Sequence, residues 1–477
     1  MLDARRRWVA FYVLCLGTLM VVLDSTIVNV ALPSIRESLG FSQASLAWVV
    51  NGYMLTFGGC LLLGGRLGDL YGQRRIFVVG ITGFTIASVG CGLSQTQAML
   101  VGFRALQGIG GAFATAVGFA VVVTLFPAPA ERAKAMGITG FVASGGGAVG
   151  VVLGGVLTDL LNWHWIFLVN VPIGIIVVAL MLRLVDESVP SDGSRRLDLA
   201  GAVTVTGALM LAVDAVVNAD QVGWASARTT VSLGIAVVLF TAFLVIETRT
   251  AVPLVRLSLF RSRNLSAANI IGVLWAAAMF AWFFLSALYL QLVLHYSPLQ
   301  VGLAFLPADL VMMAFSVSWS AKLVTRYGYR APMAGGLLLA AAGLVLFARA
   351  PVGGNFWLDV LPNMLLLGLG AGVAFNPVLL AAMSDVAPEE SGIASGAVNT
   401  SFMMGGALGL AVLASVAAAR TGHHSDAASL LSGYHLSFAI GAACAAIAAL
   451  IGWWRIREPE VTDDELYDGT SLASALG

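Results

Sequence analysis

The chain has 477 residues, of which 59% are hydrophobic and only 10% are charged, and its mean hydropathy is +0.92. Lysine plus arginine and aspartate plus glutamate each total 25, so the formal net charge is +0. Long apolar stretches cross a bilayer as helices, because lipid offers the backbone no hydrogen-bond partners. The composition therefore predicts an all-α integral membrane protein with many spans, and the balanced charge gives no reason to expect nucleic acid as a partner.

Apolar runs recur along nearly the whole chain, separated by polar residues, prolines and glycines, and predict about fourteen transmembrane helices. Their expected positions are 8–33, 44–65, 76–94, 98–126, 135–158, 164–184, 198–217, 229–248, 266–294, 299–321, 331–349, 357–384, 393–418 and 435–454. With the N-terminus inside, about twenty basic residues fall on the cytoplasmic side and about four outside, as the positive-inside rule requires. We therefore expect a multi-pass protein of the cytoplasmic membrane with both termini in the cytoplasm.

Asp24 and Arg104 are two of the ionisable residues that lie inside predicted spans. A charge at the bilayer centre costs about 2.5 to 3.5 kcal/mol on insertion scales, so such groups usually face a cavity and handle ions, protons or substrate. We expect both side chains to face the interior of the protein. The alternatives are a carboxylate that only hydrogen-bonds a neighbouring helix and an arginine that only binds helix-end carbonyls.

The chain also contains an internal repeat. Three pairs of segments match at nearly the same offset: 65–74 with 321–330, 108–111 with 368–371, and 147–150 with 406–409. Each half then holds six spans that begin inside, which implies parallel repeats with a binding site between them at the midplane. The expected domains are an N-terminal six-helix bundle at 1–184, two inserted helices at 185–265, a C-terminal six-helix bundle at 266–454 and an acidic cytoplasmic tail at 455–477.

Five motifs occur in order at 23–33, 65–75, 104–108, 165–174 and 296–302. Together they resemble the major facilitator superfamily, specifically its fourteen-span drug:proton antiporter family, and the resemblance covers nearly the whole chain. It implies the major facilitator fold, two six-helix bundles plus two inserted helices. It further implies efflux of hydrophobic or cationic drugs, antibiotics or related molecules in exchange for protons, with Asp24 and Arg104 in proton coupling.

The loop after the second predicted span has the features of a conformational latch. Its glycines permit a tight turn, its aspartate can meet the positive end of a helix, and its arginines hold it at the anionic inner surface. At Leu70 and Gln73 the family usually has basic residues instead. The alternative is a solvated basic loop. The predicted latch consists of Gly65, Gly68, Asp69, Gly72, Arg74 and Arg75.

The fifth predicted span is rich in glycine. Gly146, Gly150 and Gly154 repeat every four residues and so share one helix face, and Gly155 follows them. Small residues at this spacing let another helix approach closely. Resembling antiporters carry a proline where this chain has Val151, so one source of a helix kink is missing.

The second half supplies the predicted substrate cavity. Asp309, two residues after Pro307 in the tenth span, could attract a cationic substrate, whereas Asp214 in the inserted pair has equal reason to be structural. Aromatic faces attract cations and methionine adapts to varied shapes, although most such residues only pack or face lipid. The candidate lining residues are Trp275, Phe280, Trp282, Phe283, Tyr289, Gln291, Met312 and Met313.

Several other classes are excluded by missing motifs. An ATP-driven pump needs a Gly-x-x-x-x-Gly-Lys loop, and Lys134 and Lys322, the two lysines of the chain, do not lie in one. The hydrolase strings His-Glu-x-x-His and Gly-x-Ser-x-Gly do not occur. All four cysteines fall within predicted spans, so we expect no disulfide framework, no metal site and no cofactor.

The sequence therefore predicts a transporter rather than an enzyme. The expected partners are protons, a small-molecule substrate and the lipid bilayer. Alternatives to drug efflux are an exporter dedicated to one natural product or lipid, a metabolite:proton uptake symporter, and a sensor that keeps a transporter fold without transporting.

Overall fold

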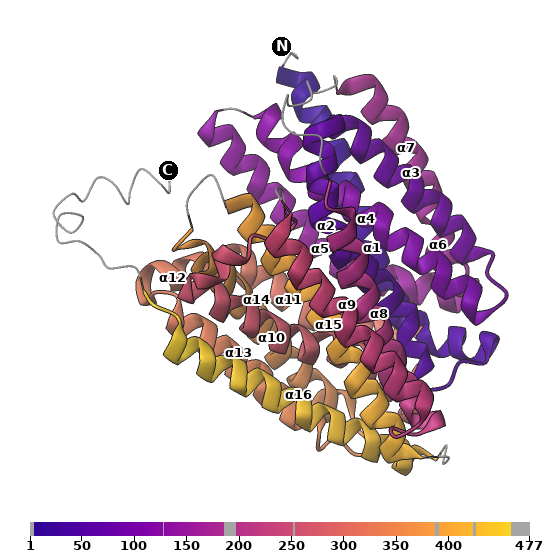
Figure 1. Cartoon of the computed structure of the whole chain (residues 1–477). Helices are drawn as coiled ribbons and strands as arrows, with labels where there is room; N and C mark the ends of the chain where they lie inside the picture. The colour runs from indigo at the N-terminus through magenta and orange to yellow at the C-terminus, as the bar shows by residue number, and fades with distance from the viewer. Residues whose placement is uncertain are drawn as a thin grey trace.

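The computed structural model describes residues 4–126, 128–185, 197–250, 253–386, 391–422 and 426–458. Within these residues the chain forms helices joined by short connections, and no strand occurs. The helices pack as two bundles, and a further helical pair lies along the boundary between them (Figure 1). The all-α fold expected from the composition is confirmed.

The first bundle is built from seven helical segments. Its sixth span is divided into α6 and α7 at Val169. The segments are α1 (Ala4–Leu39), α2 (Trp48–Tyr71), α3 (Gln73–Gly92), α4 (Gln97–Leu125), α5 (Pro129–Leu160), α6 (Trp165–Leu168) and α7 (Asn170–Leu184).

The second bundle contains π-helical turns at Tyr289–Val293, Phe315–Trp319 and Phe356–Val360. Ser297 and Gln300 form a capping box at the start of its second helix, which fixes where that helix begins. The segments are α10 (Arg263–Leu288), α11 (Pro298–Ala314), α12 (Ser320–Tyr327), α13 (Arg330–Phe347), α14 (Leu361–Met383), α15 (Ser391–Thr421) and α16 (Ala427–Arg455).

Thirteen helical segments of the described chain are long and apolar enough to cross a membrane. The predicted span at 299–321 is absent from these thirteen because α11 is a shorter apolar helix of 17 residues. Its continuation passes through the π-helical turn Phe315–Trp319 into α12. The tenth predicted span is therefore present as an interrupted helix, in which Pro307 removes one backbone donor.

The repeat seen in the sequence reappears in the helix packing. Gly150 of α5 lies so close to α1 that any added Cβ would overlap it, and Gly409 of α15 packs in the same way against α10. Likewise Gly110 of α4 packs against α3, and Gly370 of α14 packs against α13. Corresponding helices of the two halves thus meet through corresponding glycines.

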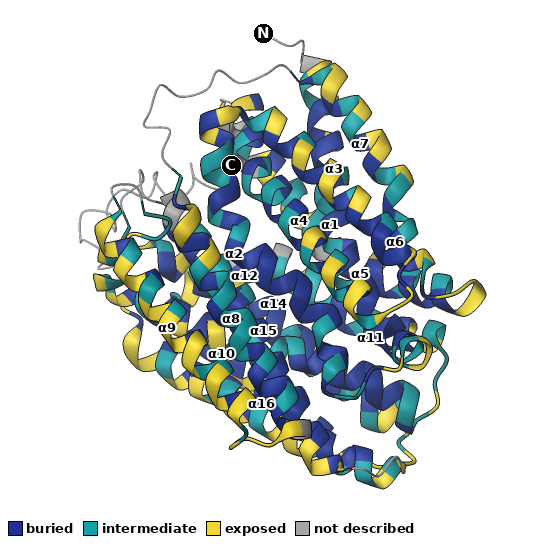
Figure 2. Cartoon of the chain, turned by 45° about the vertical axis from the view of Figure 1, so that its right-hand side comes forward, coloured by how far each residue is buried: buried dark blue, intermediate teal, exposed yellow. Residues whose placement is uncertain are grey.

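The inserted pair, α8 (Leu199–Val222) and α9 (Ala227–Arg249), lies across the boundary of the two bundles. On one side α8 packs against α2, where Thr206 meets Gly59. On the other side Ser415 of α15 donates a hydrogen bond of 3.2 Å to the Val216 carbonyl oxygen. Figure 2 shows that α9 is largely exposed on its outer face.

Asp214 connects the two inserted helices. Its Oδ2 lies 3.8 Å from Arg228 Nη2 of α9, and its Oδ1 accepts a 2.7 Å hydrogen bond from Asn218 Nδ2. These contacts give Asp214 structural partners within the inserted pair.

Candidate functional site

A buried polar network surrounds Asp24 in the middle of α1. Asp24 is 0% exposed, and its Oδ2 accepts a 2.5 Å hydrogen bond from Arg104 Nη1. Its Oδ1 accepts two more, from Gln107 Nε2 at 2.7 Å and from Asn170 Nδ2 at 2.9 Å. Arg104 and Gln107 are three residues apart and therefore share one face of α4. The carboxylate thus has three donors from α4 and α7.

Arg104 is itself held from several sides. Its Nε donates to the Val49 carbonyl oxygen at 2.9 Å, and Nη1 also donates to Gln107 Oε1 at 2.7 Å. The guanidinium carbon lies 4.5 Å from the centroid of the Tyr53 ring, and Gln107 also donates to Ser88 Oγ at 2.8 Å. Removing one member of such a buried pair leaves an uncompensated charge, at a cost of about 3–5 kcal/mol.

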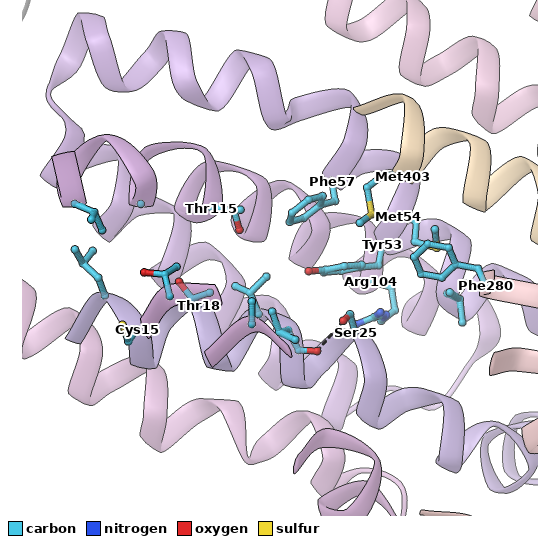
Figure 3. Close-up of a pocket in the computed structure, with 18 residues that line it drawn as sticks. Cys15, Thr18, Ser25, Tyr53, Met54, Phe57, Arg104, Thr115, Phe280 and Met403 are labelled. Atoms are coloured by element: carbon cyan, nitrogen blue, oxygen red, sulfur yellow. Dashed lines mark hydrogen bonds between the residues drawn. The ribbon is translucent and has the colours of Figure 1, made fainter. Parts of the chain in front are cut away.

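A cavity of about 220 Å³ lies beside this network (Figure 3). Most of its wall comes from α1, α2, α4 and α5, while Phe280 of α10 and Met403 of α15 contribute from the second bundle. A mainly apolar wall with a few polar groups is typical of small-molecule sites. The polar lining residues are Cys15, Thr18, Ser25, Tyr53, Arg104, Thr115 and Thr139.

The cavity lies toward the end of the first bundle that contains the N-terminus. Its lining begins at Leu14 on α1, ends at Val122 on α4 and includes Thr139 in the first part of α5. Toward the other end of the first bundle, the two bundles are in close contact. A Cβ at Gly155 of α5 would lie only 2.7 Å from the Pro298 carbonyl oxygen of α11. The structure therefore combines a cavity on one side with a closed seam on the other.

Most of the predicted cavity residues of α10 do not line this cavity. Phe280 does, but Trp282 is 1% exposed and packs against Phe283 and Phe305. Two positions along a helix correspond to a rotation of about 200°, so Phe280 and Trp282 face opposite ways. Trp275 lines a separate pocket of about 20 Å³.

The next two predicted residues make structural contacts. Tyr289 is 0% exposed, and its hydroxyl donates to the Pro351 carbonyl oxygen at 2.9 Å. Gln291 Nε2 donates to the Val30 carbonyl oxygen of α1 at 2.8 Å. The Gln291 hydrogen bond ties the two bundles together, and neither side chain belongs to the cavity lining.

The predicted residues of α11 also lie outside the cavity lining. Asp309 is 2% exposed, and its Oδ2 has no hydrogen-bond partner within the described part of the chain. Met312 packs against Gly372 of α14, and Met313 lies near Gly145 of α5. Asp309 is therefore buried where α11 packs between α5 and α14, whereas Met312 and Met313 are partly buried.

The glycines of α5 serve two different contacts. A Cβ at Gly146 would lie 3.0 Å from Val22 Cγ1, at Gly150 3.0 Å from the Leu23 carbonyl oxygen, and at Gly154 2.7 Å from the Ile27 carbonyl oxygen. All three contacts are with α1, the helix that carries Asp24. Gly155 instead faces α11 of the other bundle.

The predicted latch lies largely within α2 rather than in a loop. Gly65, Gly68 and Asp69 belong to the last two turns of α2, and Gly72 follows with φ of +97°. The expectation that Gly68 forms part of the turn is wrong, because it is helical and packs against Val117 of α4. Arg74 and Arg75 open α3, with Arg75 exposed and Arg74 partly buried.

The turn between α12 and α13 matches the Gly72 turn of the first half, and the segment that follows α16 holds it in place. Gly328 has φ of +71°, and the Glu458 carboxylate accepts hydrogen bonds of 2.8 Å from the backbone N–H groups of Tyr329 and Arg330. The Arg457 backbone N–H donates to Asn264 Oδ1 of α10 at 2.7 Å. This segment therefore links the starts of α10 and α13. The rest of the predicted acidic tail, from 459 to 477, lies outside the described residues.

Sequence reasoning did not single out Gln107, Asn170 or Tyr53. Gln107 follows Arg104 by three residues, and this spacing was the available signal for a shared helix face. Asn170 belongs to the 165–174 motif but begins α7, a helix distant in sequence from Asp24. Only the packing of α7 against α1 reveals that Asn170 donates to the carboxylate.

The fold and the site together define a two-bundle membrane transporter with a buried carboxylate–arginine pair. The sequence model of the Major Facilitator Superfamily matches residues 14–410. The chain is also 37% identical over 471 residues to the puromycin resistance protein pur8 of Streptomyces alboniger, covering 96% of this chain and 93% of that protein. The chain belongs to the Major Facilitator Superfamily, which confirms the family inferred from the motifs.

A second relative and a solved structure also match the chain. The cephamycin export protein CmcT of Amycolatopsis lactamdurans is 38% identical over 442 residues, with 90% of this chain and 91% of that protein covered. The crystal structure of the nucleoside transporter NupG matches with a TM-score of 0.67 at 13% identity, over 93% of this chain and 98% of that one. This structural likeness supports the fold alone.

Proposed function

We propose that the protein exports hydrophobic drugs, antibiotics or related small molecules across the cytoplasmic membrane, in exchange for protons and by alternating access. The observation that carries this proposal is the Asp24–Arg104 pair, buried directly beside an apolar cavity that both bundles line. The kinship to a puromycin resistance protein and a cephamycin export protein supports export as the direction.

In the proposed cycle the substrate enters from the cytoplasm, the side that the loop charges favour for the N-terminus. The two bundles then rock about their boundary, the seam between α5 and α11 opens, and the substrate leaves on the outer side. The close glycine contacts of α5 with α1 make these two helices move together. Any tilt of α5 is therefore transmitted to Asp24.

We derive proton coupling from a competition for the Asp24 carboxylate between a proton and the three hydrogen-bond donors around it. In the described conformation its oxygens are occupied by Arg104, Gln107 and Asn170. A proton that binds Asp24 must displace part of this network, because a protonated carboxyl accepts the same donors less strongly. We infer that protonation from outside loosens the network and returns the empty transporter to the inward state.

The direct test uses inverted membrane vesicles from a host that lacks its own drug pumps. An imposed proton gradient should drive uptake of a fluorescent drug into the vesicles, and a protonophore should abolish it. Uptake that is indifferent to the protonophore would contradict proton coupling. Movement in the opposite direction under the same gradient would identify a metabolite:proton symporter instead.

A second candidate is an exporter dedicated to one natural product. It is favoured by the kinship to the cephamycin export protein, which is named for a single antibiotic class. A resistance panel separates the two functions, since a multidrug exporter protects against several unrelated compounds and a dedicated exporter against one.

A further inference from the structure

The charge that faces the cavity is positive. Arg104 is the charged side chain among the described residues that line the cavity, and no carboxylate occurs in that lining set. Both partners are almost fully buried, with Arg104 1% and Asp24 0% exposed, but Asp24 does not belong to the lining. The ion pair is therefore oriented, with its guanidinium toward the cavity and its carboxylate behind.

Two hydrogen-bond donors at this point have no acceptor within the described part of the chain. The hydrogen bonds of Arg104 use Nε and Nη1, which leaves Nη2 without a partner. The Tyr53 hydroxyl also lacks one, and its ring lies 4.5 Å from the guanidinium carbon. Figure 3 shows the Tyr53 hydroxyl pointing into the cavity beside Arg104. By contrast, the nearby Ser25 hydroxyl donates to the Val22 carbonyl oxygen at 2.7 Å.

We propose that Arg104 Nη2 and the Tyr53 hydroxyl form a recognition point for a hydrogen-bond acceptor of the substrate. The substrates are then apolar or aromatic molecules that carry a carboxylate, phenolate or carbonyl group, rather than cations. A cationic group at this position would meet the guanidinium charge at close range, and the Asp24 carboxylate lies behind the guanidinium, farther from the cavity. This inference rests on the proposed transport function, of which it names the substrate class, and it replaces the expectation of cationic substrates.

The rest of the cavity fits the apolar part of such a molecule. Phe57, Phe280, Met54 and Met403 line it near Arg104. Aromatic rings stack on flat ligands and methionine adapts to their outline. A flat molecule would be oriented by a charge-assisted hydrogen bond at one end and by apolar contacts around the rest. Such contacts accept ligands of more than one shape.

The experiment compares two dyes with the same xanthene ring system and opposite charge. Fluorescein carries a carboxylate and a phenolate, whereas rhodamine 123 is a cation. Binding of each dye to the purified full-length protein in detergent is measured by fluorescence anisotropy, without any proton gradient. We expect the wild type to bind fluorescein at least about tenfold more tightly than rhodamine 123.

The variant Tyr53→Phe removes only the hydroxyl and keeps the ring beneath Arg104. It should weaken fluorescein binding by about tenfold and leave rhodamine 123 binding within about twofold of the wild type. The matched control is Tyr434→Phe, because Tyr434 is 0% exposed and lies on α16, away from the lining residues. This control should change neither affinity.

Three results would overturn the proposal: tighter or equal binding of rhodamine 123, equal loss of both dyes in Tyr53→Phe, or no binding of fluorescein. Vesicle transport is scored separately. If fluorescein binding depends on Tyr53 but no gradient-driven transport occurs, the recognition point stands and the proposed function fails. Transport of rhodamine 123 in preference to fluorescein would contradict the recognition point and leave export intact.

Discussion

The two halves of the molecule bury a carboxylate in very different ways. Asp24 of the first half receives three hydrogen bonds, one of them from Arg104. Asp309 of the second half is 2% exposed, and its Oδ2 has no partner within the described residues. The internal repeat thus keeps the helix packing in both halves, whereas the hydrogen-bonded network around a buried carboxylate lies in the first half.

The two halves also differ in the helices that could supply hydrogen-bond partners to a buried carboxylate. The match of segments 108–111 and 368–371 places Met364 and Leu367 of α14 where α4 has Arg104 and Gln107. Both residues are 0% exposed and offer no hydrogen bond to a carboxylate. The second half therefore has an apolar core where the first has a polar network, and we assign proton coupling to the first half.

The largest expected effect separates the two carboxylates. Asp24→Asn should abolish drug resistance, because the amide cannot carry the proton and leaves Arg104 without its charge partner. Asp309→Asn should retain resistance within about threefold, since it removes no observed hydrogen bond. Both variants are compared in a pump-deficient host, with membrane expression measured in parallel. Full resistance with Asp24→Asn, or loss of resistance with Asp309→Asn alone, would reverse the assignment.

The second prediction addresses the contact between α5 and α1. Gly150→Leu should block transport, because its side chain would overlap Thr26 and the backbone at Leu23. The control Gly83→Leu places the same side chain on α3, at a glycine with no atom near its Cβ position. It should leave transport unchanged. Vesicle uptake at matched expression measures both variants, and normal uptake by Gly150→Leu would show that α1 and α5 can separate during the cycle.

The sequence was sufficient to predict the family, the span order, the repeat and the two members of the ion pair. Hydropathy and glycine spacing are local properties, so they indicated the α5 face that meets another helix. The cavity could not be predicted in this way. Helical periodicity shows which residues share a face, but not which helix that face meets. The pattern therefore predicts Trp282 and Tyr289 in a cavity, whereas they pack against their own bundle.

The third prediction makes the first half resemble the second. Gln107→Leu introduces the residue that α14 carries at the matching position, and it removes the 2.7 Å bonds to Asp24 Oδ1 and from Arg104 Nη1. A lost hydrogen bond to a charged group is worth about 1.5–3 kcal/mol, so gradient-driven uptake should fall by about tenfold or more. Ser88→Ala removes the hydroxyl that accepts the second hydrogen bond of Gln107 Nε2 and should lower uptake by no more than about twofold. Equal effects of the two changes would mean that Gln107 acts through packing rather than through Asp24.

The smallest expected effect concerns the segment after α16, where Glu458 accepts hydrogen bonds from the backbone at the start of α13. Glu458→Gln keeps the shape of the side chain but removes the charge that faces the start of α13. It should lower the free energy of unfolding by about 1 kcal/mol, because an anion at a helix N-terminus and its hydrogen bonds contribute on that scale. Thermal unfolding in detergent measures the loss. Glu37→Gln, at an exposed acid of α1, is the control, and an equal shift in both variants would remove the role assigned to Glu458.

The assignment of proton coupling to Asp24 is tested by comparing two transport modes of Asp24→Asn in reconstituted vesicles. Counterflow exchanges labelled for unlabelled substrate without a proton gradient, whereas accumulation requires coupling to the gradient. If Asp24 carries the proton, the variant should retain counterflow and lose accumulation entirely. Accumulation against a concentration gradient by the Asp24→Asn protein would contradict the assignment of coupling to the first half.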